Sequence, residues 1–256
     1  MNGLLAPAAP WSPVVATEHP ARVLAIGAHP DDIDFCAGGT LARWVGSGST
    51  VSYCVVTDGD AGGHDRSVAR AAMPSIRRDE QRAAATTIGA SEVVFLGYRD
   101  GSLAVTCELR RDLARVIRRF RPDAIVCQSP QRNWLARVQA NHPDHLAVGE
   151  ATLCAVYPDA RNPFAYPELL EEGLEPYHVP AVWIANPMYP NRVVDVTDTL
   201  RAKVAALAQH ESQLPAGAER MERHVRGDAE RVADTTALGA GRMGEAFQLV
   251  VTEELH

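Results

Sequence analysis

The sequence predicts an α/β fold, a Rossmann-like three-layer sandwich built on one mostly parallel sheet. Short runs rich in β-branched residues alternate with longer helical patterns along the chain, which is typical of repeated βα units. The 256 residues, of which 46% are hydrophobic, suffice for one large core but not for several domains. We therefore expect a single domain over residues 21–256, preceded by a flexible arm over residues 1–20.

Each strand is expected where an apolar run is bounded by turn residues, as in RVLAIG and TVSYCVV. The expected strands cover residues 22–27, 50–56, 92–96, 123–128, 181–185 and 192–196. Helices are expected where apolar residues recur at a spacing of three or four, and GGTL at 38–41 is interpreted as a helix start that requires close backbone packing. The expected helices cover residues 38–47, 75–88, 108–120, 145–156 and 198–212. A charged, helix-prone stretch continues from 214 to about 232.

The charge and the cysteines narrow the class of protein. A net charge of -7 argues against a nucleic-acid or anionic-membrane partner and favours a small-molecule one. The five cysteines are scattered and form no CxxC pair, which indicates reduced thiols in a cytoplasmic protein. The first twenty residues lack a cationic start and a continuous apolar stretch, so neither a signal peptide nor a membrane anchor is expected. The sequence leaves the oligomeric state open, with a homo-oligomer as one alternative.

Two long polar loops follow expected strands, at residues 58–74 and 129–144. Loops of that length in a compact α/β domain are usually functional. In open parallel sheets, ligands bind outside the carboxyl ends of the strands, which is where both loops leave the sheet. We therefore expect a binding site at this edge.

Two His-Pro-Asp triplets predict a metal site at the same edge. AHPDD at 28–32 directly follows the first expected strand, and HPDH at 142–145 follows the fourth. His and Asp side chains suit zinc, which in catalytic sites takes three protein ligands and leaves one position open for water. Iron(II), manganese and cobalt suit the same ligands. A lone triplet is more often a turn with a capping aspartate, but two copies at matching strand ends favour a metal.

The spacing within the triplets suggests which residues bind the metal, which one acts as a base and which one contacts the oxyanion. Adjacent Asp31 and Asp32 point in different directions, whereas His29 and Asp32 can converge across a proline turn. The remaining carboxylate is then placed for general base work on water. In the second triplet, one histidine is expected as the third ligand and the other as a donor to a developing oxyanion. Asp144 is expected to orient one of these histidines through a hydrogen bond, without binding the metal itself.

The motifs in order resemble a known family. AHPDD with GGTL, R-x-x-E, FLGY-x-DG, HPDH-x-AVGEA and KVAALAQHESQ together resemble the metal-dependent N-acetylglucosamine deacetylases of the LmbE-like (PIG-L) group, over roughly residues 22 to 213. The resemblance implies His29, Asp32 and His145 as zinc ligands. It implies Asp31 as the general base, and His142 as the residue that stabilises the oxyanion and assists the leaving amine.

The resemblance also implies that Arg77 of RRDE and Asp100 of YRDG face the sugar hydroxyls. The neighbouring Arg78 is an alternative to Arg77, and only the spacing to Glu80 distinguishes them. QHESQ at 209–213 matches the family as well, but structural hydrogen bonds at a helix end are its expected role.

The sequence departs from the family pattern at three places. Asp34 stands where the family usually has Glu, Asn141 replaces the usual Gly, and the loop 129–141 with Trp134 replaces a short Gly-rich one. These changes affect the choice of substrate more than the chemistry.

The expected function is a zinc-dependent N-deacetylase that hydrolyses the amide of an N-acylated amino sugar or sugar-containing metabolite. The same scaffold also suits an amidase of a thiol conjugate, or a hydratase that adds activated water to an alkene. A third alternative is a metal- or glycan-binding module without turnover, against which the intact Asp31 beside intact ligands argues.

Overall fold

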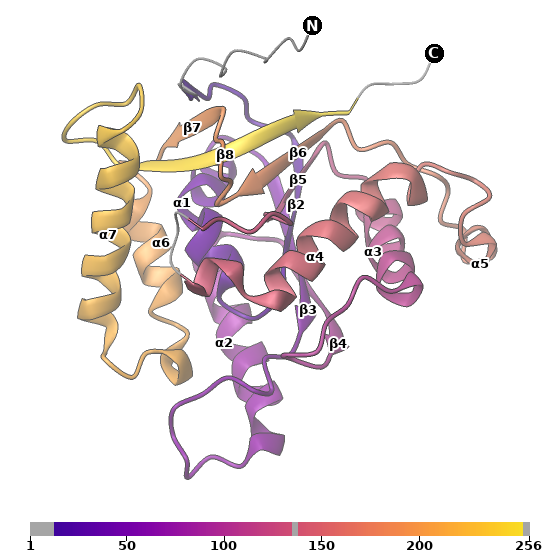
Figure 1. Cartoon of the computed structure of the whole chain (residues 1–256), viewed down its shortest axis with the longest axis horizontal. Helices are drawn as coiled ribbons and strands as arrows, with labels where there is room; N and C mark the ends of the chain where they lie inside the picture. Colours follow the sequence, from indigo (N-terminus) through magenta and orange to yellow (C-terminus); the bar gives the residue numbers. More distant parts are fainter. Residues whose placement is uncertain (1–12, 135–137, 253–256) are drawn as a thin grey trace, which may run out of the picture.

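The computed structural model describes residues 13–134 and 138–252 (Figure 1). Its centre is an eight-stranded sheet in the order β1-β7-β8-β6-β5-β2-β3-β4. All neighbouring strands are parallel except β8, which runs antiparallel to both β6 and β7. The predicted α/β sandwich with a mostly parallel sheet is confirmed. The strands are β1 (Val14–Val15), β2 (Arg22–Gly27), β3 (Thr50–Thr57), β4 (Glu92–Tyr98), β5 (Ala124–Gln128), β6 (Ala181–Ala185), β7 (Arg192–Asp195) and β8 (Gly244–Val251).

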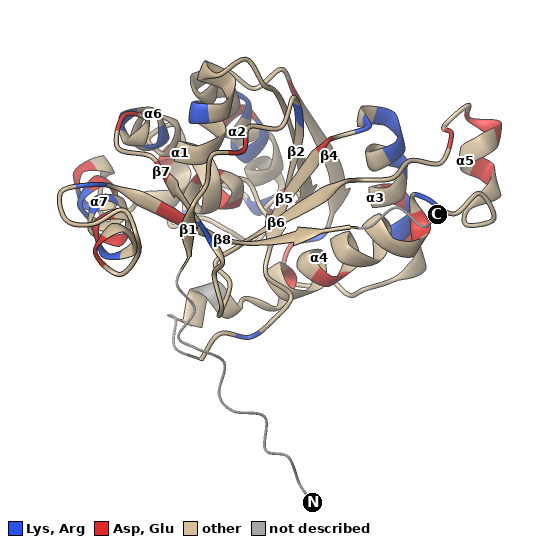
Figure 2. Ribbon diagram, turned by 90° about the horizontal axis from the view of Figure 1, so that it is seen from above, with Lys and Arg blue, Asp and Glu red and all other residues tan. Residues whose placement is uncertain are grey.

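Helices cover both faces of the sheet (Figures 1 and 2). One face carries α1, α2 and α6, with α7 packed outside α6, and the other carries α3 and α4. The α-helices are α1 (Asp32–Gly46), α2 (Met73–Ile88), α3 (Cys107–Phe120), α4 (Pro143–Cys154), α5 (Pro167–Glu171), α6 (Leu200–Leu207) and α7 (Ala218–Asp234). The shorter turns are the 3₁₀ helices η1 (Arg70–Ala72), η2 (Val138–Asn141) and η4 (Glu211–Gln213), and the π-helical turn η3 (Ala155–Asp159).

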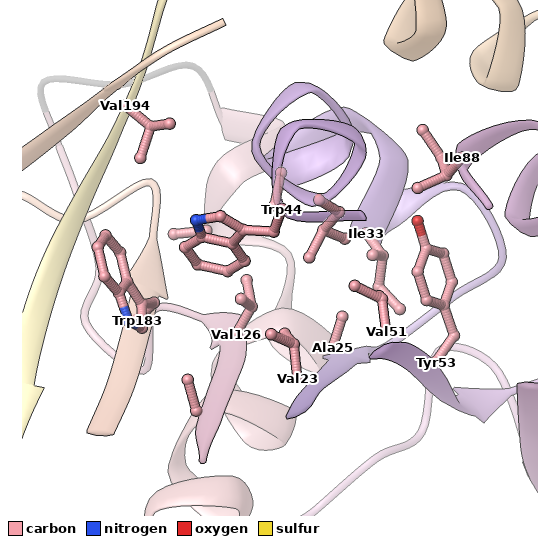
Figure 3. Packing of buried hydrophobic residues seen from close by; sticks show 14 of the residues in the cluster. Val23, Ala25, Ile33, Trp44, Val51, Tyr53, Ile88, Val126, Trp183 and Val194 are labelled. Carbon is pink, nitrogen blue, oxygen red and sulfur yellow. The ribbon is translucent and has the colours of Figure 1, made fainter. Parts of the chain in front are cut away.

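Two buried clusters hold the layers together, one on each face. The cluster under α1 includes Trp44 and Trp183, whose rings meet edge to face with their centroids 5.1 Å apart (Figure 3). The opposite cluster joins α3 and α4 to the sheet through residues such as Leu113 and Val148. The parallel strands are buried on both faces, which explains their continuous apolar runs.

The ends of the chain add elements that the sequence pattern did not predict. β1 lies within the expected arm and pairs with β7, while residues 1–12 lie outside the described part of the chain. β8 inserts between β6 and β7, although it lies more than 45 residues beyond either strand. Among the described residues, no helix is both long and apolar enough to cross a bilayer.

Helix α1 begins at Asp32, six residues before the expected start. Asp32 and Asp34 in its first turn stabilise the positive end of the helix dipole. The two glycines of GGTL therefore lie inside the helix, where the expected close packing is present. A Cβ on Gly39 would lie 2.8 Å from Val196 Cβ, and one on Gly38 would lie 3.2 Å from Lys203 Cγ.

This packing predicts that Gly39→Ala destabilises the protein. The new methyl would force α1 away from Val196, which we expect to lower the free energy of unfolding by about 1 to 3 kcal/mol. Gly46→Ala at the end of the same helix is the matched control, because a Cβ there meets nothing within 4 Å. It should raise stability by up to about 1 kcal/mol. Urea denaturation measures both, and equal effects would contradict the packing account.

Candidate active site

The candidate site lies where neighbouring parallel strands end. β2 is followed by His29, β4 by Asp100, and β5 by the loop that leads to His142 and His145. From β2 the chain adds β3 and β4 on one side and β5 and β6 on the other, so the strand order reverses between β2 and β5. Ligands of open parallel sheets bind in the crevice at such a reversal.

A strained turn separates the two adjacent carboxylates. Asp31 has a φ of 99°, a conformation that non-glycine residues seldom adopt, and α1 begins at the next residue. The Asp31 N–H donates to Gln81 Oε1 at 2.8 Å, and the Asp31 carbonyl accepts from Phe35 N at 3.0 Å. These contacts hold the turn, so the side chains of Asp31 and Asp32 reach different partners.

Asp32 joins the two triplets. Its Oδ2 lies 3.0 Å from His29 Nδ1 and accepts the His29 backbone N–H at 2.7 Å. Its Oδ1 lies 3.1 Å from His145 Nε2. The structure thus brings together His29, Asp32 and His145, the three residues expected as metal ligands.

Within the described part of the chain, two overlapping groups of side chains could hold a metal ion. One consists of His29, His142 and His145, and the other of His29, Asp100 and Asp144. Within each group the donor atoms lie within 4.8 Å of one another. His29 belongs to both groups, and its two ring nitrogens face different carboxylates.

The second ring nitrogen of His29 meets a buried carboxylate pair. His29 Nε2 lies 3.0 Å from Asp100 Oδ1 and 3.2 Å from Asp144 Oδ2. Asp144 is itself fixed by the backbone N–H groups of Gly101 at 2.7 Å and Leu103 at 3.1 Å. These carboxylates hold a proton on Nε2, so that a cation can replace the Nδ1 proton on the Asp32 side, which is how carboxylates orient metal-binding histidines. The expected ligands His29 and His145 both belong to the first of the two groups, and Asp32, which is in neither group, contacts both of them.

The charges of the site also favour a bound cation. Burial opposes protonation of His29, but attraction to Asp32 and hydrogen bonds with Asp100 and Asp144 raise its pKa to about 12. Burial alone would raise the pKa of Asp32, but the attraction of His145 and His29 lowers it well below its usual value. Negative charge around the imidazoles is an environment that stabilises a cation.

Asp31 contacts a different set of groups. Its Oδ2 lies 3.3 Å from a guanidinium nitrogen of Arg77, and the same nitrogen donates to the Pro30 carbonyl at 2.5 Å. Burial raises the pKa of Asp31 to about 6, against the opposing attraction of Arg77. A carboxyl with a pKa near neutrality is suited to take up and return a proton.

The two neighbouring arginines of RRDE have separate roles. Arg77 is buried at the site, donates to the Gly59 carbonyl at 3.2 Å and lies 4.0 Å from Asp100. Arg78 instead pairs with Asp58 at 2.5 Å and covers the Phe95 ring. Of the two, Arg77 is the one at the site, as expected.

Arg77 and Asp100 were expected to face the sugar hydroxyls. In the structure both side chains are less than a tenth exposed and contact protein groups, Asp100 with His29 and the Ala61 N–H, Arg77 with Asp31. The sugar contact therefore stays a prediction.

His142 caps the helix that carries His145. Its Nδ1 accepts the backbone N–H of Asp144 at 3.2 Å, so in the neutral ring the proton resides on Nε2. Burial, followed by the repulsion of His29 and His145, lowers the pKa of His142. A neutral His142 with a free Nε2–H can donate to an oxygen without first gaining a proton.

A buried polar network centred on Asp34 supports the Asp31 turn. Asp34 is fully buried and accepts hydrogen bonds from Tyr53 Oη at 3.0 Å and Gln81 Nε2 at 2.8 Å, and it lies 3.1 Å from His210 Nε2. Gln81 thus links Asp34 to the Asp31 backbone. Glu80 accepts from the N–H and hydroxyl of Ser212, which fixes the 210–213 turn as the structural role expected of QHESQ.

Sequence reasoning did not identify Gln81 as a site residue. The only available signal was its position four residues after Arg77, which places both on one face of α2.

Asn141 closes the long loop after β5. Its side chain accepts the Asn133 N–H at 2.6 Å and donates to the Asn133 carbonyl at 2.9 Å. The residue that replaces the usual family glycine therefore fastens the extended loop at its base. Residues 135–137 of this loop lie outside the described part of the chain.

The fold and the site define an α/β protein with a His/Asp cluster at the carboxyl edge of a parallel sheet, an arrangement suited to hydrolysis. Residues 24–156, more than half of the chain, match the PIG-L family, described as GlcNAc-PI de-N-acetylase. The chain belongs to this family, which confirms the resemblance.

Individual relatives agree with that assignment. The chain is 33% identical to a diacetylchitobiose deacetylase from Thermococcus kodakarensis over 76% of this chain and 70% of the relative. The structure of N,N'-diacetylchitobiose deacetylase from Pyrococcus horikoshii superposes with a TM-score of 0.82 at 30% identity, covering 91% of this chain and 84% of that one. The 4-carboxy-2-hydroxymuconate hydratase from Pseudomonas putida has the same fold at 23% identity, with a TM-score of 0.73 and coverage of 92% and 99%.

The geometry predicts that His145→Ala loses divalent metal. Removing one of the nitrogens that contact Asp32 should weaken zinc binding at least about 100-fold, measured by calorimetry on metal-free protein. His64→Ala is the matched control, since His64 is exposed in the loop after β3. Undiminished zinc affinity in His145→Ala would exclude this residue as a ligand.

The network under Asp31 predicts that Gln81→Met costs stability. The change leaves the Asp31 N–H and one lone pair of Asp34 without their partner, which should lower the free energy of unfolding by about 1 to 3 kcal/mol. Gln209→Met, at an exposed position on α6's end, should change it by less than about 0.5 kcal/mol. Chemical denaturation compares the two variants, and indistinguishable values would show that Gln81 does not support the turn.

Proposed function

We propose that this protein is a zinc-dependent N-deacetylase that hydrolyses the amide of an N-acylated amino sugar. Membership of the PIG-L family and the deacetylase relatives support the reaction class. The donor set of His29, Asp32 and His145 supports the metal.

One observation carries the proposal: the adjacent carboxylates have different partners. Asp32 contacts both histidines, whereas Asp31 contacts Arg77 and no member of the expected ligand set apart from its chain neighbour. A half-buried carboxylate beside a metal site but not engaged by its ligands is placed for general base catalysis.

When bound, zinc held by His29, Asp32 and His145 supplies a Lewis acid that polarises the amide carbonyl and acidifies water. Asp31 takes a proton from the attacking water as the new carbon–oxygen bond forms. Arg77 keeps the Asp31 carboxylate in position through the 3.3 Å contact. The strained turn fixes the direction from which that carboxylate approaches.

His142 stabilises the charge that develops on the carbonyl oxygen. Its Nε2–H donates to that oxygen while Nδ1 remains occupied by the Asp144 N–H. When the carbon–nitrogen bond breaks, the amine leaves with the proton that Asp31 had taken from water. The products are a carboxylic acid and a free amino sugar, and Asp31 is again ionised; the acid then gives its proton to the amine or to solvent and becomes a carboxylate.

The proposed substrate class is a small N-acetylated sugar or glycoside. The diacetylchitobiose deacetylases among the relatives support an N-acetylglucosamine unit in the substrate. The hydratase alternative has support from fold similarity alone.

Asp31→Asn should abolish turnover without loss of metal. We expect kcat for amine release from N-acetylglucosamine and diacetylchitobiose to fall at least about 1,000-fold, because the amide cannot accept a proton. Zinc content by atomic absorption should equal that of wild type. Asp79→Asn, an exposed aspartate on α2, is the control and should keep full activity.

Two results would contradict the proposal. Near-wild-type turnover in Asp31→Asn would remove Asp31 as the base. Zinc-loaded wild-type protein that releases no amine from N-acetylated sugars, but hydrates an alkene acid, would favour the hydratase alternative.

A further inference from the structure

A pocket of about 410 Å³ lies between the start of α1 and the chain that connects α6 to α7. Its apolar wall consists of Phe35, Leu214, Pro215, Ala216 and Met221. Phe35 is 37% exposed although it is a large aromatic residue, and Pro215 and Ala216 are exposed as well. We call this hollow the side pocket.

The side pocket adjoins the Asp31–Asp32 turn, which we call the catalytic turn because it carries the proposed base. Phe35 is in the first turn of α1, and its N–H donates to the Asp31 carbonyl at 3.0 Å. Side chains on a helix lean toward the preceding turn, so the Phe35 ring extends toward the Asp31–Asp32 end of α1.

A second contact connects the side pocket to Arg77. Gln213 lines the pocket and approaches Arg77 at Gly62: a Cβ built on Gly62 would lie 3.0 Å from Gln213 Oε1 and closer still to Arg77 Nη1. Both side chains therefore reach the same space beside Gly62, which is open because glycine has no side chain. The connection between α6 and α7 is itself held against α2 by the bonds of Ser212 to Glu80.

The position of the side pocket identifies the part of a substrate that can reach it. The scissile amide must lie beside His142 and His145, which are on α4, on the opposite face of the sheet from α1 and α6. The side pocket is on the Arg77 side of Asp31, away from those histidines. A group that enters it is therefore attached to the sugar and is not the acyl chain.

The lining identifies the chemistry of that group. Five of the nine lining residues are apolar, and none is acidic, although the chain carries a net charge of -7. Apolar surface placed against Phe35, Leu214 and Met221 leaves water, which favours binding in proportion to the area covered. A monosaccharide that occupies only the catalytic turn would leave this wall exposed.

We infer that the side pocket binds an apolar aglycone, so that the preferred substrate is an N-acetylated amino sugar glycoside carrying an aliphatic or aromatic group. This inference rests on the proposed deacetylase function and specifies its substrate class. Phe35 and the 214–216 turn act as the specificity determinants.

The test compares the methyl and hexyl β-glycosides of N-acetylglucosamine on zinc-loaded wild-type protein. We expect kcat/KM for amine release to be about tenfold higher for the hexyl glycoside, because its KM is lower while kcat is unchanged. A tenfold ratio corresponds to about 55 Å² of apolar surface removed from water. N-hexanoylglucosamine should gain no comparable preference over N-acetylglucosamine. A preference for the long acyl chain instead of the long aglycone would overturn the inference.

Two variants assign the preference to the side pocket. Phe35→Ala removes the aromatic wall, and Ala216→Asp places a charge in it at an exposed position. Each should reduce the hexyl-to-methyl ratio below about twofold, while Phe164→Ala, at a 90% exposed phenylalanine, should retain the tenfold ratio. Thermal unfolding midpoints close to wild type show that the variants are folded.

A binding measurement separates failure of this inference from failure of the proposed function. Calorimetry gives the Kd of both glycosides for zinc-loaded protein, independently of turnover. Tighter hexyl binding that depends on Phe35, without amine release from either glycoside, would support the pocket and contradict the deacetylase. Amine release at equal kcat/KM for both glycosides, with equal Kd values, would overturn the pocket and leave the deacetylase intact.

Discussion

The site depends on one constraint, the separation of two adjacent carboxylates at the end of a buried strand. Asp31 and Asp32 carry like charges in a desolvated environment, which is costly unless each has its own partner. The positive φ of Asp31 turns the chain so that Asp32 meets two imidazoles while Asp31 meets Arg77. The strain of this turn is balanced by the Gln81 hydrogen bond and by helix α1, which begins at once.

The surrounding fold positions these groups from several distant segments. The parallel sheet brings the ends of β2, β4 and β5 to one edge, and Asp144 links them by binding both His29 and the turn after β4. On the other side, Asp34 joins α1, α2 and the chain after α6 through Gln81 and His210. The Asp31–Asp32 turn is thereby held by hydrogen bonds on both faces of the sheet, and the proposed general base role of Asp31 requires such rigidity.

Much of this arrangement was readable from the sequence. The strands adjacent to the two His-Pro-Asp triplets and the approach of His29 and Asp32 to the second triplet followed from local pattern and the geometry of parallel sheets. The choice of His145 over His142 as the third expected ligand came from the resemblance to the PIG-L family. Strand β8 could not be predicted from the sequence, because its position between β6 and β7 depends on pairing with distant strands. The early start of α1 was missed because Gly38 and Gly39 favour a helix end by propensity, whereas tertiary packing requires them inside the helix. The role of Gln81 depends on a contact across 50 residues that no local pattern reports.

The two neighbouring aspartates are proposed to have different roles, Asp32 as a metal ligand and Asp31 as a base. Anomalous diffraction at the zinc edge, from crystals of the zinc-loaded protein, distinguishes these roles. We expect one strong peak within about 2.3 Å of a nitrogen of His29, an oxygen of Asp32 and a nitrogen of His145, with the Asp31 carboxylate outside bonding distance. A peak held by His29, Asp100 and Asp144, or one bonded to Asp31, would contradict this assignment.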